Sequence, residues 1–320
     1  MTVHMRAMIL ALLLTIQSGA ALAQMPSVSG LSAEEIAKRA AAGETEDGRI
    51  IGGTPAALGQ APFQVQILFA DDPPTALTAH RCGGALIAPQ WVLTAAHCFF
   101  QGNGNRYGAR QFAVRFGLVD ITRKAPIIPV AEKGVFLHPG YIPTNGGKPV
   151  GGGTPQPGFA LWFTHDIALV RLERPVAMSK LVQMIARDPL PPERLRRKDT
   201  LFATGWGMTR TFAQTGNEYI FNPTLQIVGL EMRDCGNQEG MLPTHFCAGA
   251  PGKDSCAGDS GGPLWRIDDS GQHILVGITS RRQLAGADCG GLDPRTRYSR
   301  IDRENGAWIT ATLAGTGERW

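Results

Sequence analysis

Short apolar stretches, interrupted at close intervals by turn-forming residues, most limit how this chain of 320 residues can fold. Each stretch is continuously apolar or alternates with polar residues, and Gly, Pro, Asn or Asp bound it, as is typical of β-strands. Strands are expected at 63–69, 84–87, 91–95, 112–116 and 166–172, and in the second half at 201–206, 225–232, 263–267 and 274–280. Many short strands with almost no helical periodicity predict an all-β barrel or sandwich.

The end of the chain differs from the rest, because apolar residues at 303–313 recur near helical spacing and predict a helix there. The segment 268–271 (Asp-Asp-Ser-Gly) predicts a hairpin turn between two of the expected strands. Two further segments are expected to be exposed loops: 144–159, which is dense in Gly and Pro, and the basic run 194–198.

The first 23 residues have the pattern of a signal peptide. Arg6 precedes an apolar run at 7–16, and a small-x-small cleavage site follows at 21–23. The alternative is an uncleaved anchor, although the apolar run is short for a membrane span. We expect an exported, secreted protein, extracellular or periplasmic, whose mature part does not enter a membrane. The formal net charge of +4 is too small to predict nucleic-acid binding.

A serine surrounded by glycines, in Gly258-Asp259-Ser260-Gly261-Gly262, is the strongest candidate for chemistry. Glycine lets a substrate approach the main chain closely, but a serine hydroxyl is a poor nucleophile without an adjacent base. A plain surface turn is the alternative. The segment also fits the G-x-S-x-G elbow of α/β-hydrolases, yet that fold places its acid and histidine after the serine, where only His273 follows.

A base and an acid precede this serine, as His97 in Thr-Ala-Ala-His-Cys and Asp166 in Asp-Ile-Ala-Leu-Val. With Ser260 they run in the order His, Asp, Ser, and from residue 49 to about 310 the chain resembles the trypsin-like (chymotrypsin-family) serine proteases. The resemblance implies an all-β fold of two antiparallel six-stranded β-barrels with a C-terminal helix. After the signal peptide (1–23), it also implies an activation propeptide (24–49) and a protease domain (50–320), with barrels at roughly 50–180 and 181–320.

The resemblance assigns catalytic roles residue by residue. His97 would be the general base, Asp166 would orient its ring, and Ser260 would attack the peptide carbonyl. The backbone N–H groups of Gly258 and Ser260 would form the oxyanion hole. Ser280 matches the serine that supports the triad aspartate. For His97 and Asp166 the alternatives are a core histidine and a turn carboxylate.

The resemblance also implies activation by cleavage after Arg49. The new α-amino group of Ile50 would then enter the second barrel and form a buried ion pair with Asp259. An ordinary strand start after a basic linker is the alternative. Because the segment 24–49 has no cysteine, no disulfide would hold it after the cut.

Six cysteines allow about 15 pairings, and sequence alone does not choose among them. A zinc site is the alternative, but no C-x-x-C spacing supports one. The resemblance implies the pairs Cys82–Cys98, Cys235–Cys247 and Cys256–Cys289.

The resemblance places Asp254 at the floor of the specificity pocket, which favours Arg or Lys at the substrate position P1. Two residues depart from the usual pattern: Arg282 stands in a pocket wall, and Thr296 stands where such pockets usually keep glycine. Small or otherwise altered P1 specificity is therefore the alternative. The expected substrate-binding residues are Asp254, Ser255, Ser280, Arg282 and Thr296.

The expected function is that of a secreted serine endopeptidase, made as a zymogen, that hydrolyses peptide bonds after Arg or Lys. Its expected partners are protein or peptide substrates, an activating protease (itself included) and protein inhibitors, with no metal, cofactor, nucleic acid or membrane. A non-catalytic binding protein of the same fold is the alternative from a different functional class.

Overall fold

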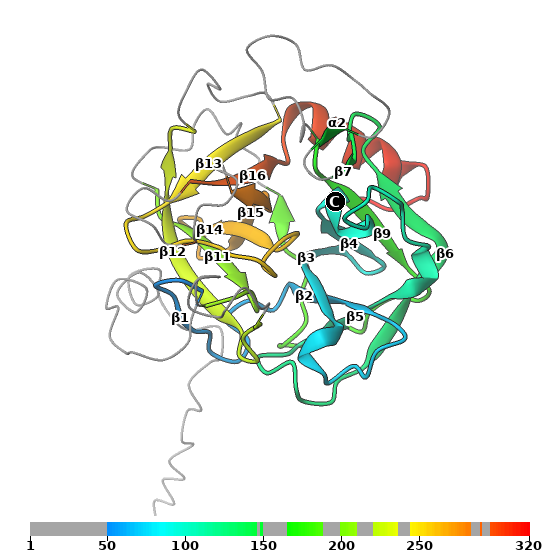
Figure 1. The fold of residues 1–320 in the computed structure, drawn as a ribbon, viewed down its shortest axis with the longest axis horizontal. Helices are drawn as coiled ribbons and strands as arrows, with labels where there is room; N and C mark the ends of the chain where they lie inside the picture. The colour runs from blue at the N-terminus through cyan, green and yellow to red at the C-terminus, as the bar shows by residue number, and fades with distance from the viewer. Residues whose placement is uncertain are drawn as a thin grey trace, which may run out of the picture.

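The computed structural model describes residues 50–145, 148–149, 165–187, 199–209, 220–235, 244–282, 289 and 295–320. The expected signal peptide and propeptide, the basic run at 194–198 and most of the insertion at 144–159 lie outside these residues. The described chain forms two barrels that lie next to each other (Figure 1).

The first barrel is closed and antiparallel, with six strands in the order β2-β3-β4-β9-β6-β5. Apolar side chains of these strands, such as Val65, Leu86 and Leu169, are fully buried inside it. The burial supplies the driving force for closing the sheet. Its strands are β2 (Gln64–Phe69), β3 (His80–Ala88), β4 (Trp91–Thr94), β5 (Phe112–Phe116), β6 (Ile127–Leu137) and β9 (Ala168–Leu172).

The second barrel follows the order β12-β11-β14-β15-β16-β13, and a further pairing of β12 with β13 closes it. Its strands are β11 (Leu201–Gly205), β12 (Gln226–Arg233), β13 (His245–Gly249), β14 (Pro263–Ile267), β15 (His273–Arg282) and β16 (Thr296–Arg300). Two short strands extend this sheet: β1 (Thr54–Pro55) is antiparallel to β12, and β10 (Ala186–Arg187) is parallel to β15. The prediction of two six-stranded antiparallel barrels is confirmed.

The remaining elements are short. They are β7 (Thr144–Asn145), β8 (Lys148–Pro149), the 3-10 helices η1 (Leu77–Ala79), η2 (Ala96–Phe99) and η3 (Ala109–Gln111), and the helix α2 (Arg303–Ala314). The expected C-terminal helix is therefore confirmed, and its Ile309 and Leu313 are buried in the main apolar core. The described part of the chain contains no helix that is long and apolar enough to span a membrane.

The turn at 268–271 and all three disulfides agree with the predictions. The amide of Gly271 donates to the carbonyl of Asp268, and the Asp268 carboxylate accepts from the Ser270 and Gln272 amides. The disulfides join Cys82 to Cys98, Cys235 to Cys247, and Cys256 to Cys289, so no cysteine is left over. Three barrel strands were not among the expected ones, namely β6, β13 and β16.

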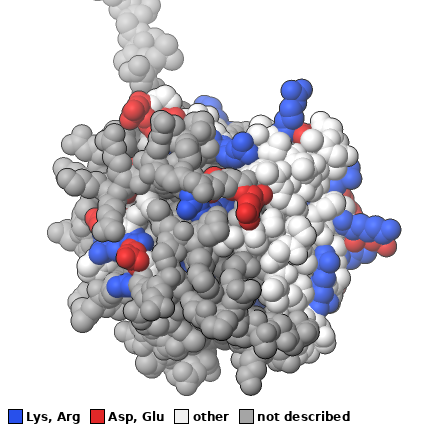
Figure 2. Space-filling model, turned by 90° about the horizontal axis from the view of Figure 1, so that it is seen from above, with Lys and Arg blue, Asp and Glu red and all other residues white. Residues whose placement is uncertain are grey.

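Among the described residues, charged side chains do not gather into one large patch on the face drawn in Figure 2. Basic and acidic side chains both occur there, and the described surface between them is largely uncharged. The small net charge of the chain agrees with this mixture.

Candidate active site

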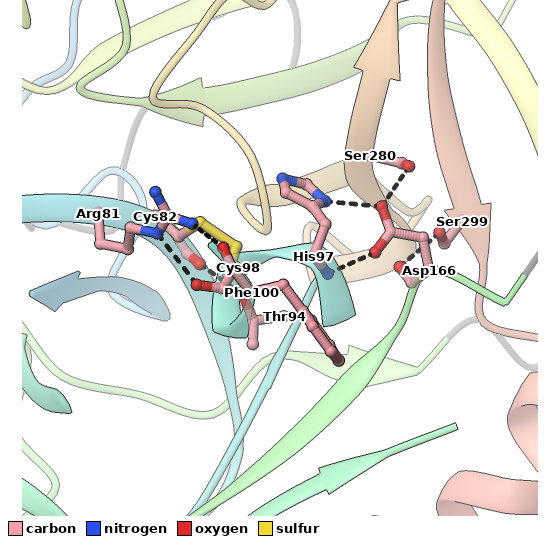
Figure 3. A network of polar contacts seen from close by, with 10 residues as sticks. Arg81, Cys82, Thr94, His97, Cys98, Phe100, Asp166, Ser280 and Ser299 are labelled. Carbon is pink, nitrogen blue, oxygen red and sulfur yellow. Dashed lines mark hydrogen bonds and ion pairs between the residues drawn. A yellow bond between two sulfur atoms is a disulfide. The ribbon is translucent and has the colours of Figure 1, made fainter. Parts of the chain in front are cut away.

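His97 lies in the 3-10 helix η2, directly after strand β4, and two contacts hold this helix to strand β3. The first is the Cys82–Cys98 disulfide. The second is Arg81, whose guanidinium donates to the carbonyls of Cys98 and Phe100 at 3.0 and 2.8 Å (Figure 3). The same guanidinium lies over two aromatic rings, at 5.7 and 5.6 Å from their centroids. His97 is thus fixed by its backbone while its ring remains 28% exposed.

Asp166 is fully buried just before strand β9, and both of its carboxylate oxygens accept hydrogen bonds from His97. Oδ2 accepts from the His97 ring Nδ1 at 2.7 Å, and Oδ1 accepts from the His97 amide at 2.9 Å (Figure 3). The hydroxyl of Ser280 also donates to Oδ2, and that of Ser299 donates to the Asp166 carbonyl at 2.7 Å. The neutral ring therefore keeps its proton on Nδ1 and presents Nε2 as a base.

The ionised state of Asp166 depends on these donors. Burial by itself would raise the pKa of the carboxyl group, but its attraction to the His97 ring when that ring is protonated, and the hydrogen bonds from His97 and Ser280, outweigh it and hold the pKa below its usual value. Asp166 is therefore a buried carboxylate at neutral pH, which is the state that stabilises an imidazolium.

The backbone at His165 turns sharply into Asp166, with φ at 57° in the left-handed region. The His165 ring stacks on His138, with centroids 4.0 Å apart, and its Nδ1 lies 2.8 Å from the Asn305 side-chain oxygen in α2. These contacts offset the strain of a non-glycine residue at positive φ. They fix the turn that places Asp166 beside His97.

Ser260 lies on a loop that hydrogen-bonds to both barrels. Its carbonyl accepts from the Gly83 amide in β3 at 2.8 Å, and the next amide, of Gly261, donates to Thr279 in β15 at 2.7 Å. Gly261 has φ at +77°, and a Cβ there would come within 2.1 Å of the Thr94 hydroxyl oxygen, so only glycine fits. Ser260 is half-buried, and within the described residues its hydroxyl makes no hydrogen bond to the His97 ring. In enzymes that pair a nucleophile with a base, this contact is commonly loose without substrate.

Gly258, the other expected oxyanion residue, is fixed by His80. The His80 ring Nε2 donates to the Gly258 carbonyl at 2.9 Å. Gly258 has φ at +96°, and a Cβ would meet the Phe221 ring at 2.8 Å. Burial lowers the pKa of His80 to about 4, although the bond to Gly258 works in the opposite direction. His80 is therefore neutral, and a single tautomer satisfies the Gly258 carbonyl.

Asp259 is buried inside the second barrel, where its carboxylate accepts from the amides of Gly207 and Cys256, both at 2.8 Å. Burial raises the pKa of this carboxyl to about 7, and the charge of nearby Asp254 adds to the effect. Ile50 is fully buried in the core of the same barrel. The carbonyl of the next residue, Ile51, accepts from the Asp254 amide at 3.1 Å. The start of the described chain thus lies beside the loop that carries Asp259.

The expected pocket-floor residues lie together and are almost completely buried. The hydroxyl of Thr296 donates to Asp254 Oδ1 at 2.6 Å, and the hydroxyls of Ser255 and Tyr298 lie 2.9 Å apart. Arg282 pairs with Thr296 in the β15–β16 ladder, but its side chain and Arg49 lie outside what the structure describes.

Comparison with known proteins agrees with this arrangement. The family model described as Trypsin matches residues 50–308. The chain belongs to the trypsin family. It is 31% identical over 276 residues to phenoloxidase-activating factor 3 of Holotrichia diomphalia, covering 82% of this chain and 72% of that protein. It is 30% identical over 251 residues to the venom peptide isomerase heavy chain of Agelenopsis aperta, covering 75% of this chain and 90% of that protein.

Three side chains that support this trypsin-family site were not predicted from the sequence: His80, Arg81 and Ser299. Each acts on a residue far along the chain, and His80 contacts Gly258 across a separation of 178 residues. The sequence offers one clue to two of them. His80 and Arg81 directly precede Cys82, whose expected disulfide partner, Cys98, follows His97.

Among the described residues, one group of side chains has atoms close enough together to be considered as metal ligands. A ring nitrogen of His97 and the sulfurs of Cys82 and Cys98 lie within 4.8 Å of one another, the one such group in the described residues. Because the sulfurs form a disulfide, neither supplies a thiolate to a metal.

Proposed function

We propose that this trypsin-family protein is a secreted serine endopeptidase that is made as a zymogen. The observation that carries the proposal is the pair of hydrogen bonds from His97 to Asp166. The ring Nδ1 lies 2.7 Å from Oδ2, and the backbone amide lies 2.9 Å from Oδ1. A buried carboxylate that fixes one tautomer of a partly exposed histidine is what a general base requires. The Gly83–Ser260 hydrogen bond ties the candidate nucleophile to the barrel that carries this histidine.

In the proposed reaction, the Ser260 hydroxyl oxygen bonds to the carbonyl carbon of the substrate while its proton passes to His97 Nε2. The carbonyl oxygen becomes an oxyanion held by the amides of Gly258 and Ser260. His97 then returns the proton to the leaving amine as the peptide bond breaks. Water attacks the acyl-enzyme in the same way and restores Ser260. Each oxyanion donor contributes roughly 10²–10³ in rate.

Activation would follow cleavage after Arg49. The freed amine of Ile50 would supply the cation that the buried Asp259 carboxylate needs, because a buried charge without a partner is costly. The raised pKa of Asp259 in the uncut chain supports this proposal. The three disulfides fit an oxidising compartment, in agreement with export through the expected signal peptide.

For substrate choice we propose cleavage after basic residues. The carboxylate of Asp254 is buried at the expected pocket floor, where its negative charge would favour a basic P1 side chain. Small or altered P1 specificity is the competing possibility, because Thr296 stands beside this carboxylate.

The test is direct, and it must measure peptide hydrolysis itself because one relative is named an isomerase. Protein cut at Arg49 is treated with a fluorophosphonate probe and assayed on peptides that vary only at P1, with Ser260→Ala as the control. Labelling and cleavage that both depend on Ser260 are expected. A folded, cut protein that does neither would be a binding protein rather than an enzyme.

A further inference from the structure

One side chain of the C-terminal helix α2, that of Asn305, contacts the turn that carries Asp166. Asn305 is only 1% exposed, and both ends of its amide are hydrogen-bonded. Its Nδ2 donates to the carbonyl of Arg300 at 2.6 Å, so its Oδ1 faces the ring of His165 and accepts from Nδ1 at 2.8 Å. The two residues are 140 positions apart in the chain, and this bond fixes the tautomer of the His165 ring with its proton on Nδ1.

Other groups enclose the same ring. It stacks on His138, with centroids 4.0 Å apart and an interplanar angle of 8°. On a further side Gly140 lies so close that a Cβ there would come within 2.5 Å of the ring. A second residue of α2, Glu304, brings its carboxylate to 3.6 Å from Nε2. The His165 side chain is only 14% exposed, so its ring cannot move without disturbing these neighbours.

The position of this ring matters because the backbone at His165 is strained. In the part of the chain that the structure describes, it is the one non-glycine residue at positive φ. A side chain disfavours this conformation, which persists only where neighbouring contacts hold it. The carbonyl of His165 also accepts from the Ile167 amide at 2.7 Å and closes a three-residue turn around Asp166. Rotation of the His165 backbone would therefore displace the carboxylate that binds His97.

We propose that Asn305 is a positioning residue for the hydrolysis, because it holds the His165 ring and so keeps the strained turn closed with Asp166 aligned on His97. The inference rests on the proposed function, since it gives α2 a part in that chemistry. Ser299 holds the other residue of the turn, by donating to the Asp166 carbonyl at 2.7 Å (Figure 3). The competing account is that Asn305 only satisfies the Arg300 carbonyl before the helix.

The first experiment compares kcat and KM of Asn305→Ala with those of the parent, both cut at Arg49 and assayed on one peptide. We expect kcat to fall about tenfold or more with KM nearly unchanged, since a small misplacement of a catalytic group is costly. Thr312→Val is the matched control in the same helix, because its hydroxyl donates to the Trp308 carbonyl at 2.8 Å and does not contact the turn. Equal losses of kcat in the two variants would mean that only the integrity of the helix matters, and would overturn the proposal.

The second experiment changes His165 itself. His165→Ala and His165→Gly both remove the ring, but alanine keeps the penalty for positive φ and glycine does not. The alanine variant should therefore lose about fivefold more kcat than the glycine variant, in proportion to the strain that the ring contacts offset. Equal kcat values would show that the turn does not need to be held, and would overturn the proposal even if Asn305→Ala did not fold.

The third experiment combines the two positions. Adding Asn305→Ala to His165→Gly should lower kcat by less than about twofold, because the ring that Asn305 holds is then absent. A loss as large as in the parent background would mean that Asn305 acts through the Arg300 carbonyl alone. Fluorophosphonate labelling keeps the two proposals apart. Labelled parent protein whose Asn305→Ala variant is equally active removes this inference and leaves the protease, whereas folded, cut parent protein that is not labelled removes the proposed function.

Discussion

The ring of His80 donates a hydrogen bond to the carbonyl oxygen of Gly258 at 2.9 Å, and so fixes the orientation of a residue whose own amide is the proposed oxyanion donor. The ring is buried among aromatic side chains, with Trp206 and Phe221 packed edge-on at 6.1 and 5.1 Å between centroids. His80 is thus a positioning residue, since it acts through Gly258 and not on the substrate.

Replacing His80 by phenylalanine should lower kcat about tenfold with little change in KM. The ring volume is kept, but the Gly258 carbonyl loses its donor, and the loss is smaller than the roughly 10²–10³ for removing an oxyanion donor itself. Steady-state kinetics of the cut enzyme provide the measurement. His273→Phe is a matched control, because that ring packs on Phe63 and Trp265 away from Gly258. Equal effects of the two variants on kcat would contradict the positioning role.

His80 should also make the fold sensitive to acid. Its pKa falls from about 6.5 in an unfolded chain to about 4 in the folded protein. Between these values the unfolded chain binds more protons, so His80 contributes stability above pH 6.5 that is lost as the pH falls toward 4. At roughly 1.4 kcal/mol per pKa unit, this loss is on the order of 3 kcal/mol.

Urea unfolding at several pH values, in the Ser260→Ala background to prevent self-digestion, measures this loss. The Asp259 carboxyl acts in the opposite direction, since its raised pKa favours the folded state at low pH. The comparison must therefore be between His80→Phe and its parent, and the variant should lose less stability on acidification. Parallel curves for the two proteins would show that His80 does not titrate as described.

Asp259→Asn should separate folding from activation. The amide side chain has one acceptor oxygen in place of two, so it can accept from only one of the Gly207 and Cys256 amides. The intact precursor should therefore still fold but unfold at a moderately lower urea concentration. After cleavage at Arg49, however, the Ile50 amine has no carboxylate partner. Breaking a buried ion pair costs roughly 3–5 kcal/mol, so kcat/KM should fall at least about 100-fold. Full activity of the cut variant would argue against the proposed ion pair, as would wild-type activity that persists well above pH 10.

Ser280→Ala should lower kcat about tenfold and move the acid limb of the pH–rate profile upward. The lost hydroxyl stabilises the ionised form of Asp166, so the pKa of that carboxyl should rise when the donor is removed. Ser299→Ala is the matched control, because its hydroxyl donates to the backbone carbonyl of the same residue. We expect the control to leave the acid limb in place, and an identical shift in both variants would contradict the assignment.

The strands that were predicted correctly are those whose buried residues are mostly apolar. Strands β5 (Phe112–Phe116) and β14 (Pro263–Ile267) have the predicted bounds. Strand β16 was missed because Thr-Arg-Tyr-Ser-Arg looks like an exposed basic segment, yet all five residues are buried. One of its arginines, Arg300, is compensated by an ion pair with Asp302, at 3.0 Å between Nε and Oδ1. Partners of this kind are not visible in a hydrophobicity pattern.

Strand β6 was missed for a different reason. Its middle contains Glu132, Lys133 and Gly134, which interrupt the apolar alternation. The structure accommodates them by shifting the register against β9 between Val130 and Val135. A local bulge preserves the barrel while breaking the alternation of apolar and polar residues from which a strand is predicted.

The candidate catalytic residues were accessible from sequence through their motifs, whereas the residues that position them had no motif of their own.

The three disulfides divide between the two halves of the molecule, since Cys82–Cys98 lies in the first barrel and the other two pairs lie beyond residue 234. With all six cysteines used in this way, no covalent link other than the main chain joins the barrels. A single nick between β10 and β11 would therefore yield two fragments that separate in detergent without a reducing agent. The proposed active site, with His97 on one fragment and Ser260 on the other, would survive such a nick only for as long as packing alone kept the halves together.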